Sequence, residues 1–236
     1  MLKKVKLALI AFVLSLFPVS GYSCFDVYTI ILNRPITYPA HEAALSLGTE
    51  YTFTHMSAPE EDEISLPARL YYGITEHFTA YAGGEVAGVR SPESFDYNAT
   101  DIGLFYNVYN SELFSFTPAA ETHFPYKGGA PAHDISMILT KPVNNWFVVL
   151  HPKLEMTPAE DGGTSNVFGY HFGVFYNFGS HSSLGWGHEY FDKALTTSLF
   201  IGSFIGDRLF FQTEIIKGLT DEAQNYGFAA SLKYVL

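Results

Sequence analysis

From residue 43 to the last residue, the chain repeats short segments in which apolar and polar side chains alternate. In the segment 64–74, Leu66, Leu70 and Tyr72 fall on one face, whereas Ser65 and Arg69 fall on the other. Strict alternation is typical of β-strands, because successive side chains point to opposite faces of a sheet. No segment keeps the apolar stripe of an amphipathic helix for three turns. The chain is therefore predicted to be all-β.

Counting the alternating runs predicts a transmembrane antiparallel β-barrel of about twelve strands, with about ten as the alternative count. The strands are expected near 43–54, 64–75, 77–88, 99–109, 112–123, 133–141, 145–156, 166–178, 182–191, 194–204, 208–218 and 226–236. Each has about the 9–11 residues that a tilted strand needs to cross the membrane core. Tight connections, such as Asn110-Ser111 and Gly179 to His181, follow the even-numbered strands, and most odd-numbered strands precede longer polar loops. Short periplasmic turns and longer external loops are typical of outer-membrane barrels.

Composition favours such a barrel over a soluble β-sandwich. Only 16% of the 236 residues are charged, whereas soluble domains carry about 25%. The polar face of the strands holds mostly Gly, Ser, Thr, Asn and single charges, which suits a crowded lumen better than a solvated surface. The net charge of -11 argues against a nucleic-acid partner, because phosphate binding needs a basic face. A single Cys excludes a disulfide framework and a cysteine-rich zinc site.

The amino-terminal part of the chain divides into two segments. Residues 1–23 have the features of a secretory signal peptide, with three lysines before an apolar run from Leu7 to Phe17 that is too short to span a bilayer. Residues 24–42 are predicted to form a periplasmic pre-barrel segment, either inside the lumen or along the periplasmic rim. Residues 43–236 are predicted to form the barrel. Lipidation of Cys24 stays open, because the preceding residues depart from a lipobox.

The last strand resembles the carboxyl-terminal assembly signal of bacterial outer-membrane proteins. Phe228 and Tyr234 alternate along it, and Leu236 stands where a terminal Phe is usual. This resemblance implies that the chain uses the outer-membrane assembly machinery and contacts outer-membrane lipid and lipopolysaccharide. The implied location is the outer membrane of a Gram-negative cell, with both termini in the periplasm, and a monomer is expected.

The first third of the chain after the signal peptide carries a second resemblance. The segment 33–40 (NRPITYPA), followed by 44–48 (ALSLG), looks like the start of a broad group of barrels described as outer-membrane transporters of the phenol-degradation (meta-pathway) type. The segment 66–74 (LPARLYYGI) is similar to their second strand. The resemblance implies a barrel fold and transport, and it leaves the substrate open because barrels host many functions.

Charged and histidine side chains occupy the predicted inward face, and carboxylates outnumber bases among them. The candidate lumen-lining residues are Glu50, Arg69, Glu85, Asp101, Glu121, His123, Asp134, His151, Lys153, Glu155, His171, Glu189, Glu214 and Lys233. They either form an ion-pair network that fills the lumen or line a water-filled path. The expected function is a channel or transporter for small solutes, either cation-preferring or for small apolar compounds. A closed structural or surface-interaction barrel is the alternative.

No cofactor and no metal site are predicted. Five residues, Glu121, His123, Asp134, His151 and Glu155, could converge near the long-loop end of the lumen. No spacing among them is specific for a metal.

A lipid hydrolase is a further alternative, although the chain is not expected to be an enzyme. His181 and Ser183 repeat the His-x-Ser pair of outer-membrane phospholipase and lipid A deacylase barrels, in which the imidazole takes the hydroxyl proton. Leu184 stands where Asn usually follows. The predicted turn also puts His181 on the periplasmic rim, whereas those enzymes act on the outer leaflet.

Overall fold

The computed structural model describes residues 26–32, 34, 36–53, 62–89, 96–126, 128–159, 163–223 and 226–236. The predicted signal peptide, 1–23, and Cys24 lie outside this part of the chain. Within it, no helix is long and apolar enough to cross a membrane.

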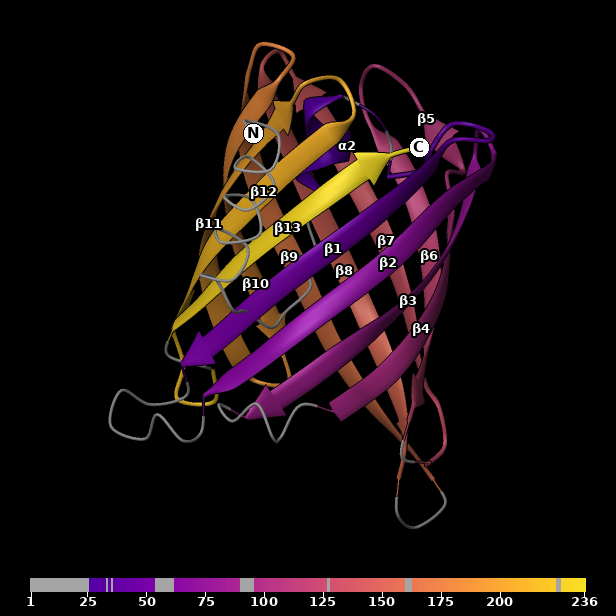
Figure 1. Ribbon diagram of the computed structural model, residues 1–236, viewed down its shortest axis with the longest axis vertical. Helices are drawn as coiled ribbons and strands as arrows, with labels where there is room; N and C mark the ends of the chain where they lie inside the picture. The colour runs from indigo at the N-terminus through magenta and orange to yellow at the C-terminus, as the bar shows by residue number, and fades with distance from the viewer. Residues whose placement is uncertain are drawn as a thin grey trace, which may run out of the picture.

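Twelve long antiparallel strands of the described chain close into a tilted barrel (Figure 1). They are β1 (Ala43–Phe53), β2 (Glu63–Thr75), β3 (Phe78–Val89), β4 (Asp96–Tyr106), β6 (Ser115–Pro125), β7 (Ala132–Val143), β8 (Trp146–Pro158), β9 (Thr164–Phe178), β10 (Ser182–Phe191), β11 (Ala194–Ile205), β12 (Leu209–Gly218) and β13 (Tyr226–Val235). Each long strand pairs with the next one along the chain, and β1 pairs with β13 to join the first strand to the last. The predicted all-β barrel of twelve strands is confirmed.

Side chains alternate between the outside of the barrel and its lumen, as the period of two predicts. On β1 and β2, Leu47 and Leu70 lie on the outside and are 52% and 50% exposed. On β1 and β4, Glu50 and Asp101 point inward and are buried. The outer wall is therefore apolar, and most charged strand residues face the lumen.

The connections sort onto two rims. One rim, called here the short-turn rim, carries the turns 76–77, 144–145, 179–181 and 206–208, together with the carboxyl end of the chain (Figure 1). The strands β1, β3, β6, β8, β10 and β12 end at the opposite rim, called here the long-loop rim. The short connection there, Asp192-Lys193, has positive φ at both residues (43° and 73°), as a two-residue hairpin turn requires.

The predicted tight turn at Asn110-Ser111 between strands 99–109 and 112–123 is wrong in its bounds. The strand β4 ends at Tyr106, and the next long strand begins only at Ser115. A two-residue strand, β5 (Tyr109–Asn110), pairs with the start of β6. The reason is Asn107, whose side chain donates a hydrogen bond to Thr117 Oγ1 at 2.9 Å while its backbone N–H donates to the carbonyl of His77. These bonds take the chain out of the β4 ladder before the turn.

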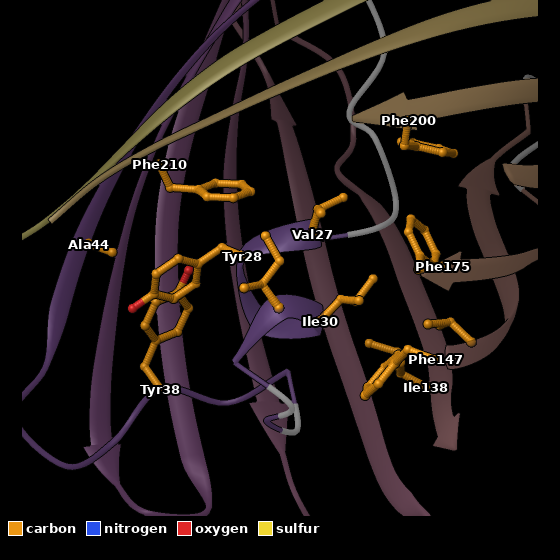
Figure 2. Packing of buried hydrophobic residues seen from close by; sticks show 12 residues of the cluster. Val27, Tyr28, Ile30, Tyr38, Ala44, Ile138, Phe147, Phe175, Phe200 and Phe210 are labelled. Carbon is orange, nitrogen blue, oxygen red and sulfur yellow. The ribbon is translucent and has the colours of Figure 1, made fainter. Parts of the chain in front are cut away.

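A segment that precedes the first strand fills the barrel at the short-turn rim. This plug segment comprises the described residues 26–32, 34 and 36–42, and it contains the helix α2 (Val27–Ile31), all of whose side chains are buried. Figure 2 shows Val27, Tyr28 and Ile30 directed from α2 toward the wall of the barrel. They belong to one buried apolar cluster with wall residues from many strands, among them Ala44, Ile138, Phe147, Val149, Phe175, Phe200 and Phe210. At this level the lumen is a packed hydrophobic layer.

Candidate functional site in the barrel lumen

The plug segment is anchored to the last strand by a lysine that is surrounded by aromatic rings. Lys233 Nζ lies 2.5 Å from Asp26 Oδ2, and the lysine side chain is only 7% exposed. The same ammonium group lies 5.0–5.4 Å from the ring centroids of Tyr28, Tyr38 and Tyr71, where an aromatic face attracts a cation. One buried charge therefore holds two parts of the plug segment against β13 and β2.

Hydrogen bonds from the barrel wall satisfy the irregular backbone of the plug segment. The backbone N–H of Val27 donates to Gln212 Oε1 at 3.2 Å, and Asn177 Nδ2 donates to the carbonyl of Ile30 at 3.0 Å. The N–H of Tyr38 donates to Thr79 Oγ1 at 2.7 Å. Buried backbone groups need such partners, so the plug segment is docked specifically.

Two tyrosine hydroxyls bind carboxylates within the plug segment. Tyr38 donates to Asp26 Oδ2 at 3.2 Å, and Tyr28 donates to Glu42 Oε1 at 3.1 Å. Burial raises the pKa of both phenols above their usual value. Both hydroxyls therefore stay protonated and act as donors at neutral pH.

Above the plug segment, toward the long-loop rim, charges of both signs form an ion-pair chain along the inside of the wall from β2 to β8. Its members are Arg69, Asp101, Glu121, His123, Asp134 and Lys153. Arg69 Nη2 lies 3.3 Å from Asp101 Oδ2 and 2.8 Å from Glu121 Oε1. His123 lies between two carboxylates, with Nδ1 at 2.8 Å from Asp101 Oδ1 and Nε2 at 2.9 Å from Asp134 Oδ2. Because each ring nitrogen faces a carboxylate, both nitrogens donate, and His123 is an imidazolium.

The ion-pair chain ends at Lys153, whose ammonium lies 2.6 Å from Asp134 Oδ2 and 3.8 Å from Glu155 Oε2. Within the described residues, one group of three potential metal ligands has donor atoms within 4.8 Å of one another, and it is Asp101, Glu121 and His123. These donors are already engaged by Arg69 and by one another. The group is therefore satisfied as an ion-pair network without an ion.

Three further predicted lumen residues form a row on neighbouring strands. His151 of β8 is the direct cross-strand partner of His171 of β9, which in turn is the partner of Glu189 of β10. The two imidazole rings stack with centroids 5.3 Å apart. His171 Nδ1 lies 3.6 Å from Glu189 Oε2. This row is called here the His-His-Glu row.

The remaining predicted residues, Glu50, Glu85 and Glu214, give part of the wall an acidic character. Glu50 is 1% exposed and Glu214 is 5% exposed. Glu50 interacts electrostatically with Glu214, Glu85 and Glu189. No described residue forms a hydrogen bond with either carboxylate oxygen of Glu50.

A cavity of about 340 Å³ lies in the lumen above the plug segment. The ion-pair chain and the His-His-Glu row both contribute to its lining, as do the aromatic rings of Tyr71, Tyr81 and Phe105. Asp26 and Ile36 of the plug segment border it as well. The cavity combines fixed charges of both signs with apolar rings, so it suits a solute that carries both polar and apolar parts.

The structure divides the fourteen predicted lumen residues into four groups instead of one continuous lining. Of the five residues considered for a metal, Glu121, His123 and Asp134 share the ion-pair chain. Glu155 pairs with its end, and His151 stacks on His171 instead. Convergence of all five is therefore not observed.

Sequence reasoning missed the aromatic lining of the lumen. Tyr38 of the plug segment and Tyr71, Tyr81 and Phe105 of the neighbouring strands β2, β3 and β4 stack in series along the wall, with successive ring centroids 5.1–5.5 Å apart. The signal was present in β2, where Tyr71 has the same parity as the inward-facing Arg69. Assigning every second residue of each strand to the lumen, apolar residues included, would have identified Tyr71, Tyr81 and Phe105.

The two residues of the hydrolase alternative have separate partners. His181 Nδ1 lies 2.7 Å from Ser180 Oγ in the turn 179–181. Ser183 is buried, and its hydroxyl donates to the carbonyl of Tyr176 at 3.2 Å. The Ser183 hydroxyl therefore serves the wall of the barrel in this arrangement.

Comparison with solved structures gives the fold. The chain is similar to the NanC porin, with 11% identity, a TM-score of 0.61, and coverage of 82% of this chain and 100% of that one. The KdgM porin in complex with disordered oligogalacturonate matches with 10% identity, a TM-score of 0.59, and coverage of 82% and 98%. The outer membrane protein Omp33 of Acinetobacter baumannii matches with 9% identity, a TM-score of 0.50, and coverage of 83% and 98%.

The comparisons with sequences add no closer relationship. No protein family matches the chain, and no curated protein matches it. The class that the fold defines is a closed twelve-stranded antiparallel barrel with the architecture of outer-membrane porins.

Proposed function

We propose that the chain is an outer-membrane channel or transporter for small solutes whose lumen is closed at the short-turn rim by the plug segment. The observation that carries this proposal is the combination of an apolar outer wall with a polar cavity inside the barrel. Large apolar side chains are exposed on eleven of the twelve long strands, as at Leu104, Trp146 and Ile201. Exposed apolar surface of this extent suits lipid.

The same reasoning supports the orientation and the partners. In barrels of this class short turns face the periplasm, so the short-turn rim with the plug segment is proposed to be periplasmic, as are both termini. The outer wall contacts outer-membrane lipid and lipopolysaccharide, and β13 carries the signal for the assembly machinery. Among the described residues, the twelve long strands close into a ring without an unpaired edge, which is consistent with a monomer.

The lumen favours cations in this proposal. Eight carboxylates stand among the predicted lumen residues, and they outnumber Arg69, Lys153, Lys233 and the imidazolium of His123. The aromatic wall of the cavity also fits small apolar or aromatic solutes, which is what the similarity to the phenol-degradation group implies. Displacement of the plug segment from the lumen would open the cavity to both rims.

The test is single-channel recording of the refolded chain in a planar bilayer under a salt gradient. Discrete openings with a cation-selective reversal potential support the proposal. Neutralising Glu50 and Glu214 to Gln should then move the reversal potential toward zero. Equal or anion-favouring permeability would contradict cation preference, and a folded but silent protein would contradict a channel that opens unaided.

The closed structural or surface-interaction barrel remains the second candidate, because one observation favours it. The apolar layer around α2 packs the lumen from wall to wall, with Val27, Phe175, Phe200 and Phe210 at most 2% exposed. If variants that loosen the plug segment stay silent in the bilayer, the closed barrel replaces the channel as the better account.

A further inference from the structure

The His-His-Glu row brings together three side chains that commonly ligate metals, on three neighbouring strands. His151, His171 and Glu189 are in direct cross-strand register, and all three border the cavity above the plug segment. Side chains directly opposite one another on neighbouring strands have Cβ atoms about 4.5–5.5 Å apart. Three such side chains can therefore reach one common point in the cavity.

His151 is the member whose hydrogen-bonding capacity no described residue meets. Both of its ring nitrogens are buried, and neither has a hydrogen-bond partner in the described part of the chain. Leaving a buried polar atom unsatisfied costs about 1–3 kcal/mol, and such atoms are rare in folded proteins. The ring borders the cavity, so rotation of the side chain would bring a nitrogen to a partner from outside the polypeptide.

The other two members are placed to share that partner. The rings of His151 and His171 are inclined by 27° and stack at 5.3 Å. The Glu189 side chain is 46% exposed and lies 3.6 Å from His171 Nδ1. Two imidazoles and one carboxylate form a donor set that suits Zn²⁺, and imidazole also suits Cu²⁺ and Ni²⁺.

We propose that His151, His171 and Glu189 bind a divalent transition-metal ion in the lumen. Water or a solute in the cavity completes the coordination, because the row supplies three ligands from one wall. The imidazole rings turn toward the ion when it binds, since the three donor atoms stand further apart than a bound metal would hold them. Binding requires no conduction, so the proposal stands independently of the channel.

The surrounding charges permit such an ion. Lys153 lies two residues from His151 on the same face of β8, but Asp134 binds its ammonium at 2.6 Å and offsets the charge. The competing group at Asp101, Glu121 and His123 is a poorer site, because both nitrogens of His123 already face carboxylates. A metal there would have to displace the Arg69 guanidinium from both acids.

The experiment is equilibrium dialysis of the untagged, refolded full chain against Zn²⁺, with retained metal measured by mass spectrometry. A single ion per barrel is expected. His151→Ala, His171→Ala and Glu189→Gln should each weaken binding roughly tenfold or more, because even outer-shell changes cost about 10–100-fold. Cu²⁺-loaded protein should show nitrogen hyperfine coupling in its electron paramagnetic resonance spectrum, and His151→Ala should reduce that coupling.

Two matched variants locate the ion. His188→Ala removes a histidine of β10 that contacts Trp186 on the outer wall, and it should leave binding unchanged. His123→Ala tests the ion-pair chain and should also leave binding unchanged. Retention of the heat-dependent gel shift of a folded barrel shows that each variant has folded, and His151→Asn replaces His151→Ala if the alanine variant has not. Absence of retained Zn²⁺, or loss of it in His123→Ala but not in His151→Ala, overturns the proposal.

Discussion

Arg69 and Glu121 lie 52 positions apart in the sequence, yet Arg69 Nη2 and Glu121 Oε1 are 2.8 Å apart inside the barrel. The same guanidinium nitrogen also reaches Asp101. The arginine side chain is 12% exposed, and the two acids are 5% and 17% exposed. Two carboxylates therefore share one guanidinium, and Asp101 is bound by His123 as well.

Arg69→Met is expected to destabilise the barrel strongly, because it leaves Glu121 without its nearest counter-charge and removes one of the two cations that bind Asp101. Removing one partner of a buried ion pair costs about 3–5 kcal/mol. The free energy of unfolding in urea, followed by tryptophan fluorescence, measures the effect. Arg34→Met is the control, since the Arg34–Glu42 pair is more exposed at 34% and 20%, and it should cost about 0–1 kcal/mol. Equal losses in the two variants would contradict a buried network.

Lys233→Met is expected to loosen the plug segment. It leaves Asp26 without its cation and removes the ammonium group that Tyr28, Tyr38 and Tyr71 surround. With about 3–5 kcal/mol lost from docking, the plug segment should become sensitive to protease, and the open time in bilayer recordings should rise.

The control for this variant is Lys217→Met, because Lys217 lies over the ring of Tyr226 at 4.1 Å, near the long-loop rim. It should leave protease sensitivity and open time unchanged. A Lys233→Met protein that is as protease-resistant as the parent would show that the apolar packing of α2 alone holds the plug segment.

Gly73→Ala should displace the plug segment from β2. A Cβ atom at position 73 would lie 1.9 Å from the carbonyl oxygen of Pro39 and 2.6 Å from that of Tyr38, so the backbone of the plug segment has to move. Overpacking of this kind costs about 1–3 kcal/mol, and protease sensitivity of the plug segment should rise.

Gly103→Ala is the matched change for this test. Its Cβ would meet the ring of Tyr81 at 2.1 Å, and Tyr71 separates that ring from Tyr38 of the plug segment. It should lower the stability of the barrel without raising protease sensitivity of the plug segment. If the two alanine variants behave alike, the contact between Gly73 and Pro39 has no particular role.

A disulfide between the plug segment and the wall should hold the channel closed. A Cβ atom at Gly202 would lie 3.2 Å from Val27 Cβ, close to the roughly 3.5–4.5 Å of disulfides. Val27→Cys with Gly202→Cys, combined with Cys24→Ser, should therefore be silent in a bilayer when oxidised. Reductant should restore the parent conductance. The conductance of each single cysteine variant should be the same with and without reductant. Conductance through the oxidised protein would place the path elsewhere than past α2.

The strands and their outward faces could be predicted from the sequence, because the alternation follows directly from strand geometry. Leu66, Leu70 and Tyr72 were assigned together to one face, and all three are exposed on the outer wall. The predicted end of the strand 99–109 was wrong, because β4 ends before Asn107. There a side-chain hydrogen bond competes with the backbone pairing of the strands and leaves no periodic signal in the sequence.

The partners within the lumen could not be predicted in the same way. The inward parity of Arg69 and Glu121 was evident, but their pairing depends on barrel curvature and strand stagger, which one sequence does not reveal. The plug segment was left between the lumen and the rim, because an irregular chain with a five-residue helix has no period to extend. The inward aromatics Tyr71 and Phe105 were missed because only polar residues were assigned to the lumen.

The bond between Asp26 and Lys233 has a consequence for the order of assembly. The two residues are 207 positions apart, so the ribosome makes Asp26 long before it makes Lys233. The residues that bind α2 come from strands between β1 and β13. They form a complete binding site only when the barrel has closed. The plug segment can therefore complete its contacts only after the last strand has joined the sheet.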